Sequence, residues 1–318
     1  MIFVRLSTLA VLDVTGRDAP RIANNLCTAD VAKLEPGYGR EAFVTEVRGK
    51  TLGHVCLFRS EWGVRLIGAG ADAARAIPNQ ALAIAAHFDR YTIREQSQPE
   101  DRSEQFAAFV LSDGLRSLLG MPIVATGHPL DLPFFPYAIG DAVAGSAYQM
   151  PWWHPRATLL LVPSDAAETT RNHLLARGGV EATETEFHQR RIETGFPWYG
   201  VDLDASNLPQ EADRDELAIS FTKGCYLGQE TVARLDSLGQ VQKKLVRWSL
   251  TSQTPPVAST ELREGDRVVG RLTSIAPGDD ARQFHALGFA RRSHFDPGSR
   301  ATGINSDGSL IQAVVSQP

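Results

Sequence analysis

Lys223-Gly224-Cys225-Tyr226-Leu227-Gly228-Gln229-Glu230 is the stretch from which the rest of the sequence is best interpreted. The apolar run before it, residues 217–221, predicts a strand, and residues 231–235 after it predict a short helix. The two glycines allow the backbone to turn tightly on either side of the cysteine. A cysteine between a strand end and a helix start lies near oriented N–H groups, and Lys223 is close in sequence. Both features favour the thiolate form of Cys225.

These eight residues have two interpretations. One is a tight turn in which a small cysteine simply fits. The other comes from a resemblance, because Lys-Gly-Cys-Tyr-x-Gly-Gln-Glu resembles the signature of the YgfZ-type folate-binding proteins, relatives of the glycine-cleavage T-protein (aminomethyltransferase) family. The resemblance implies tetrahydrofolate, or a derivative, as the cofactor and an association with iron–sulfur cluster assembly or repair. It makes Cys225 and Lys223 the candidate catalytic residues.

A second segment, residues 191–202, resembles the Arg-Ile-Glu-x-Gly-x-Pro-x-x-Gly-x-Asp segment of the T-protein family. In that family the glutamate grips the pterin ring of tetrahydrofolate. An ionised carboxylate can accept both the amino group and the ring N–H of a pterin. The resemblance therefore implies that Glu193, Arg191 and Tyr199 bind the cofactor. The alternative is a solvated helix end followed by aromatic packing residues.

Arg234 lies where many relatives of this family have an arginine, and it either meets a carboxylate of the ligand or pairs with Glu230. The cluster Lys243, Lys244 and Arg247 either lines a groove for an anionic tail or is a solvated face.

His54 marks a departure from the T-protein pattern. It stands in the predicted strand 51–58, at the place of the family's key aspartate. Histidine can act as an acid or a base near neutral pH, but it cannot supply a fixed negative charge. The sequence therefore includes His54 among the cofactor-binding candidates and puts aminomethyl transfer in doubt.

Composition limits the class of protein. The 318 residues are 43% hydrophobic and 22% charged with a net charge of −5, which is typical of a globular protein without a dominant nucleic-acid surface. Three cysteines without a Cys-x-x-Cys pair fit a reducing compartment. The sequence shows no signal peptide, membrane span or metal motif. We therefore expect a cytoplasmic protein with no bound metal, and neither membrane nor nucleic acid as a partner.

The order of predicted elements indicates an α+β fold. By resemblance we expect two ferredoxin-like α+β units and a small C-terminal β-barrel around a central hole. The folate-binding region spans residues 1–243, with a first unit of residues 1–50 and 140–243 and a second of residues 51–139. From residue 244 to residue 318, short β-rich runs separated by Pro and Gly predict the barrel.

The resemblance therefore implies a tetrahydrofolate-binding accessory protein for iron–sulfur cluster assembly or repair. Its expected partners are folate and iron–sulfur client or assembly proteins. One alternative is a folate-dependent aminomethyl or one-carbon transferase. Another is a binding or scaffold module that has kept the fold and lost the ligand.

Overall fold

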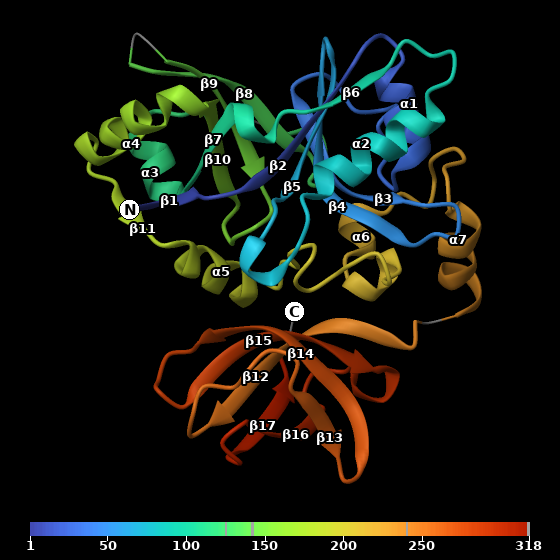
Figure 1. Ribbon diagram of the computed structural model, residues 1–318, viewed down its shortest axis with the longest axis vertical. Coiled ribbons are helices and arrows are strands. Elements are labelled where there is room, and N and C mark those ends of the chain that lie inside the picture. The colour runs from blue at the N-terminus through green and yellow to red at the C-terminus, as the bar shows by residue number, and fades with distance from the viewer. Residues whose placement is uncertain (125, 141–142, 240, 317–318) are drawn as a thin grey trace.

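The structure is a computed structural model that describes residues 1–124, 126–140, 143–239 and 241–316. A large sheet with helices lies above a closed β-barrel, and helices α5 and α6 lie between the two (Figure 1). No helix in these ranges is long and apolar enough to cross a membrane.

The large sheet has eleven strands in the order β11-β1-β7-β10-β9-β8-β3-β4-β5-β2-β6. Along the chain these strands are β1 (Ile2–Leu6), β2 (Leu9–Thr15), β3 (Tyr38–Thr45), β4 (Thr51–Ser60), β5 (Gly63–Ala69), β6 (Gln98–Asp101), β7 (Phe106–Leu111), β8 (Leu132–Ile139), β9 (Val143–Met150), β10 (Ala157–Pro163) and β11 (Val180–Ala182).

Several strands are buried on both faces, which explains their continuous apolar sequences. In β2, Leu9 and Val11 belong to one core cluster, whereas Leu12 and Val14 belong to another. The first of these clusters also contains residues of β1, β7, β9 and β10, so it joins the two halves of the sheet.

The helices cover the outer faces of the two halves (Figure 1). A core cluster of β2–β5 also contains α1 and α2, and a core cluster of β7 and β10 contains α3 and α4. The helices are α1 (Ala19–Leu26), α2 (Gln80–Tyr91), α3 (Asp113–Leu118), α4 (Ala167–Ala176), α5 (Glu184–Glu193), α6 (Asp215–Ala218) and α7 (Gln229–Leu238), with 3-10 turns η1 (Ala73–Arg75), η2 (Ser103–Gln105), η3 (Ser164–Ala166), η4 (Pro209–Ala212) and η5 (Arg292–His294).

The C-terminal part closes into a barrel in the order β12-β15-β14-β13-β16-β17. Its strands are β12 (Lys243–Ser252), β13 (Glu261–Glu264), β14 (Arg267–Pro277), β15 (Gln283–Arg291), β16 (Arg300–Ile304) and β17 (Leu310–Val315). Alternate residues point inward to a core of their own, in which Trp248 is fully buried. The α+β class and the C-terminal barrel predicted from the sequence are confirmed.

The division of residues 1–243 into two units stays a prediction. The boundary expected at residue 50 falls in the turn between β3 and β4, which pair from Gly39–Phe58 to Thr45–Thr51. Gly49 in that turn has a φ of +77°, a conformation that favours glycine.

The strand predicted at residues 217–221 is wrong. Residues 215–218 form the short helix α6, and the chain after it is irregular. The backbone groups that a strand would offer to a sheet bond instead to Thr28. Thr28 Oγ1 donates to the Ala218 carbonyl at 2.6 Å, and the Thr28 carbonyl accepts from the Ser220 N–H at 2.9 Å. A short apolar run cannot by itself distinguish a buried helix from a strand.

A buried ion pair fastens the barrel to the rest of the chain. Arg191 of α5 contacts Asp202 at 2.7 Å, and their side chains are 2% and 0% exposed. From the barrel, Thr273 and Ser274 both donate to Asp202, and Ser274 also accepts from Arg191. These hydrogen bonds satisfy the buried charges, which would otherwise oppose folding.

Arg191→Met is predicted to destabilise the protein by about 3–5 kcal/mol, because it leaves the Asp202 carboxylate buried without its cation. Urea unfolding of the variant and the parent measures the difference. The matched control Arg177→Met replaces an exposed arginine and leaves stability unchanged. A loss below 1 kcal/mol for Arg191→Met would contradict this role of the pair.

Candidate functional site

The cysteine-bearing turn lies between α6 and α7 and is anchored by Lys223. The Lys223 ammonium donates to the carbonyl oxygens of Asn24, Cys27 and Ala29 at 2.6, 2.9 and 2.6 Å. Asn24 is in the last turn of α1, where helix carbonyls lack intrahelical partners, and Cys27 and Ala29 follow the helix. Because an ammonium has three N–H donors, all of them are used here. Lys223 therefore holds the turn in place, and its role as a catalytic residue stays a prediction.

The residues after Cys225 fix the turn against its neighbours. Leu227 donates its N–H to the Asn25 carbonyl at 2.8 Å and accepts from Thr45 Oγ1 at 2.6 Å. Gly228 has a φ of +84°, and a Cβ there would lie 2.5 Å from the backbone carbonyl oxygen of Glu46. Cys225 itself is exposed, whereas the other two cysteines are buried. The structure thus presents one reachable thiol on an anchored turn.

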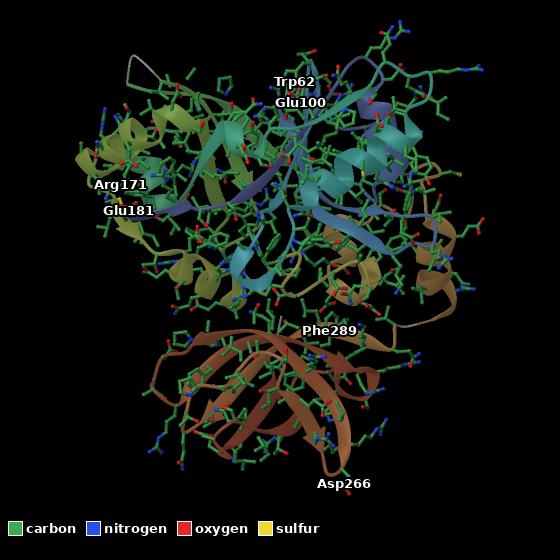
Figure 2. The ribbon with its side chains drawn as sticks, in the orientation of Figure 1. Trp62, Glu100, Arg171, Glu181, Asp266 and Phe289 are labelled. Carbon is green, nitrogen blue, oxygen red and sulfur yellow. The ribbon has the colours of Figure 1, made fainter. Side chains whose placement is uncertain are left out.

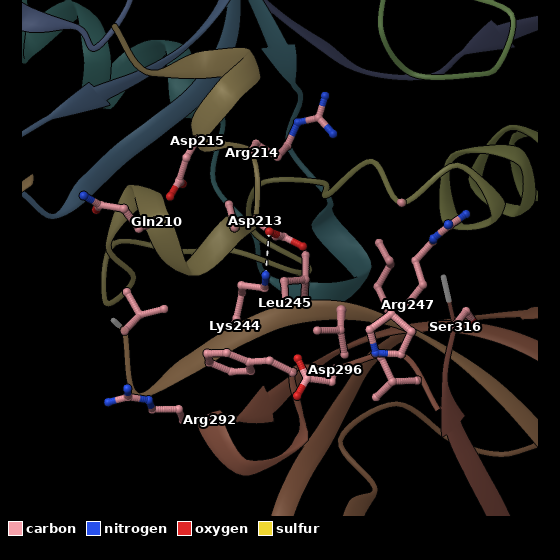
Figure 3. A pocket seen from close by; sticks show the side chains of 18 of the residues that line it. Gln210, Asp213, Arg214, Asp215, Lys244, Leu245, Arg247, Arg292, Asp296 and Ser316 are labelled. Atoms are coloured by element: carbon pink, nitrogen blue, oxygen red, sulfur yellow. Dashed lines mark ion pairs between the residues drawn. The ribbon is translucent and has the colours of Figure 1, made fainter. Parts of the chain in front are cut away.

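A cavity of about 870 Å³ lies between α5, η4, α6 and the barrel (Figure 3). Thr194 and Gly195, which directly follow Glu193, form part of its wall. The apolar part of the wall comes from η4, α6, α7, the connection after α7 and the barrel, and its members are Ala212, Leu217, Leu235, Val241, Leu245, Val246, Leu287, Phe295, Pro297 and Val315. This volume lies within the range of about 300–1,000 Å³ that is typical of ligand sites.

The polar part of the cavity wall carries both signs of charge. Lys244 reaches toward Asp213, with 2.8 Å between Nζ and Oδ1 (Figure 3). Arg247 donates to the Glu193 carbonyl at 2.8 Å, and burial lowers the pKa of Arg247. Arg292 also lines the cavity and is exposed. Two of the three cations in the predicted basic cluster, Lys244 and Arg247, therefore line the cavity.

The third cation of that cluster lies at the junction with the barrel. Lys243 approaches Glu211 at 3.5 Å, and its ammonium lies 4.6 Å from the centre of the Phe289 ring. Phe289 lies at the edge of the barrel that faces the helices (Figure 2). It packs against clusters that contain α6 and α5 residues, so it helps to close the junction.

The predicted cofactor-binding residues do not form one group. Glu193 is exposed, and its carboxylate accepts from Gln189 Nε2 at 3.1 Å. Arg191 is directed to Asp202, and among the described residues no ion pair joins it to Glu193. Arg234 is exposed on α7. Their roles toward a folate stay predictions.

His54 belongs to a buried group that the sequence did not reveal. Its Nε2 lies 2.8 Å from Glu41 Oε1, and Arg214 forms a two-pronged ion pair with the same carboxylate. The imidazole is stacked between Phe43 and Phe196, with ring centres 4.7 and 5.1 Å away. Burial opposes the charge of Glu41, but Arg214 and His54 outweigh it and hold the pKa of Glu41 at about 2.

The hollow beside His54 is nearly filled. It holds about 10 Å³ and is walled by Trp152, Phe196 and Trp198. Tyr199 also lines it, donates its hydroxyl to the Thr51 carbonyl at 3.2 Å, and has a pKa that burial raises to about 12. A space of this size holds about one water molecule. His54 therefore has no room for a substrate in this arrangement.

Comparison with known proteins places this geometry in context. No family model matches the chain. The tRNA-modifying protein YgfZ of Escherichia fergusonii is 26% identical over 266 residues, which cover 81% of this chain and 74% of that protein. An aminomethyltransferase of Streptomyces avermitilis is 23% identical over 325 residues, which cover 96% of this chain and 82% of that protein.

A solved structure agrees with these relatives. The glycine cleavage system aminomethyltransferase T from Bartonella henselae has a TM-score of 0.79 at 16% identity, covering 99% of this chain and 84% of its own. Over most of its length the chain is similar to YgfZ proteins and to aminomethyltransferases. The expected resemblance to YgfZ-type proteins and aminomethyltransferases is thus confirmed, and the structural likeness establishes the shared fold.

Sequence reasoning missed Glu41 and Arg214. The two residues are 173 positions apart, and no motif connects them. The register of β3 and β4 places Glu41 opposite Cys56 and Phe43 opposite His54, so a register prediction offers the only sequence signal for the Glu41–His54 contact.

Glu41→Gln is predicted to destabilise the protein by about 3 kcal/mol at pH 7, because the carboxyl pKa falls from 4.5 to about 2 on folding. A depressed acid pKa gives stability that is complete above pH 4.5 and is lost as the pH falls toward 2. Urea unfolding at several pH values tests this, since the gap between parent and variant should narrow below pH 4.5. The control Glu61→Gln changes an exposed acid, and a constant gap for Glu41→Gln would contradict the assignment.

Proposed function

We propose that the chain binds tetrahydrofolate, or a derivative, in the 870 Å³ cavity and serves iron–sulfur cluster assembly or repair through Cys225. The observation that carries this proposal is the position of the cavity. Its wall contains Thr194 and Gly195, which belong to the segment that resembles the folate-gripping segment of the T-proteins. The YgfZ-type and aminomethyltransferase relatives support a folate ligand.

The composition of the cavity wall fits this ligand. The apolar residues of the barrel and α7 can cover a flat heterocycle, while Lys244, Arg247 and Arg292 offer donors to carboxylates. Glu193 is exposed next to the wall and can accept from the pterin amino and ring N–H groups. When bound, a reduced folate supplies a carrier for one-carbon units.

The cysteine turn is connected to the same cavity. Helix α7 begins at Gln229, directly after the turn, and Leu235 on this helix lines the cavity. Because α7 links Leu235 to the turn, a ligand that contacts Leu235 can bias the position of Cys225. The exposed thiol then acts toward iron or sulfur in the cluster of a partner protein.

The alternative of an aminomethyltransferase has less support. His54 is held by Glu41 and stacked between two phenylalanines, and only about 10 Å³ lies beside it. The name of the relative from Escherichia fergusonii refers to tRNA modification, which applies to that protein. For this chain, the expectation of no nucleic-acid partner stays a prediction.

Glu193→Gln is predicted to weaken tetrahydrofolate binding by at least tenfold, because an amide can accept only one of the two pterin N–H groups at the same position. Titration under anaerobic conditions, followed by tryptophan fluorescence, measures the dissociation constant. Glu61→Gln, at the turn between β4 and β5, is the matched control and should bind like the parent. Equal affinities for all three proteins would remove Glu193 from the site.

Cys225→Ser is predicted to keep folate affinity and thermal stability and to lose function toward iron–sulfur proteins, because the exposed sulfur is absent. The measurement is the activity of iron–sulfur enzymes in cells that carry only this variant. Glu193→Gln serves as the comparison, since it alters the ligand site and leaves the thiol. If Cys225→Ser cells match the parent, the thiol has no role.

A further inference from the structure

A second cavity, of about 280 Å³, lies on another side of α5. It is walled by α5, the β1–β2 connection, the segment after β5 and residues 198–201, and it shares no lining residue with the large cavity. Its volume is just below the range of about 300–1,000 Å³ for ligand sites, so it suits a molecule much smaller than a folate.

His188 supplies this cavity with a fixed hydrogen-bond donor. Its Nδ1 accepts from Arg191 Nε at 2.7 Å. Burial, together with the positive charges of Arg191 and Arg75, lowers the pKa of His188 to about 3. The imidazole is therefore neutral and carries its proton on Nε2. Among the described residues, no group accepts a hydrogen bond from Nε2.

The two acids that line the cavity are already satisfied. Glu184 accepts from both the backbone N–H and the hydroxyl of Ser7. Asp72 accepts from the Arg75 backbone N–H at 3.2 Å and contacts the Arg75 guanidinium at 3.3 Å. A guanidinium has five N–H donors, so Arg75 keeps donors for a ligand after this contact.

The remaining walls are apolar and aromatic. Trp198 lies edge-on to His188, with ring centres 5.7 Å apart and an angle of 87°. Ile77 packs so closely on Gly200 that a Cβ at residue 200 would lie 2.4 Å from Ile77 Cγ2. Gly200 has a φ of +87°, so both its backbone and this contact favour glycine. The segment after β5 thus closes one side of a defined cavity.

We propose that this second cavity binds a small, flat monocarboxylate, whose carboxylate accepts from Arg75 and His188 Nε2 and whose body packs on Trp198. The ligand is anionic because the Arg75 cation and the His188 Nε2 donor keep N–H groups for a ligand, whereas both acids already accept hydrogen bonds. The site goes beyond the proposed folate function and does not depend on it.

Benzoate and benzamide are suitable probes, because they share a shape and differ in charge. We expect benzoate to bind at least tenfold more tightly than benzamide in an NMR titration of the intact protein. The shifts should be largest at the His188 imidazole and the Trp198 indole. Equal binding of the two probes, shifts confined to other residues, or no binding of benzoate would overturn the proposal.

Two variants locate the carboxylate. Arg75→Gln removes the cation, and His188→Asn keeps an acceptor for Arg191 while it removes the Nε2 donor. Each should weaken benzoate binding about tenfold and leave benzamide binding unchanged. Arg48→Gln changes another exposed arginine, and Arg292→Gln removes a cation from the wall of the large cavity; both should bind benzoate like the parent. Parent-like affinity in both Arg75→Gln and His188→Asn contradicts the site, whereas loss in Arg292→Gln would place benzoate in the large cavity instead.

Discussion

The buried pair of Arg191 and Asp202 is the constraint on which the rest of the structure depends. A charge this deeply buried is stable only when every donor and acceptor is matched. Here the matching groups come from α5, from residues 196–202 and from strand β14. Meeting that requirement fixes the barrel against α5. The pair also positions groups in the walls of both cavities. Arg191 orients His188 in the 280 Å³ cavity, and Thr194 and Gly195, shortly after Arg191 in the chain, line the 870 Å³ cavity.

This arrangement separates the large cavity from His54. Around His54 the chain has aromatic packing and an ion pair between Glu41 and Arg214, and the remaining hollow is about 10 Å³. The large space lies instead against the barrel, where apolar strands and cations meet. A protein built in this way can hold a ligand without reacting with it. Such a design suits a role in which the bound cofactor controls an exposed thiol.

Much of the fold was predictable because its signals are local. Hydrophobic pattern and turn residues predict three of its features: the hairpin around Gly49, the strand at residues 9–14 that is buried on both faces, and the short strands after residue 244. The site was harder, because its key contacts join residues far apart in sequence. Glu41 meets Arg214, Lys223 meets the end of α1, and Arg191 meets Ser274. The sequence of the motifs did not indicate that Arg191 would pair with Asp202 or that Lys223 would donate to backbone carbonyls, so neither charge was predicted to bind groups of the protein itself.

The central claim is that a reduced folate occupies the space between α5, α6 and the barrel. A crystal structure of the protein grown with tetrahydrofolate under anaerobic conditions tests it most directly. The account predicts density for the pterin against Thr194, Gly195 and the barrel wall, with Trp152, Phe196 and Trp198 unmoved. Density for the pterin beside His54, after displacement of those aromatic rings, would contradict it.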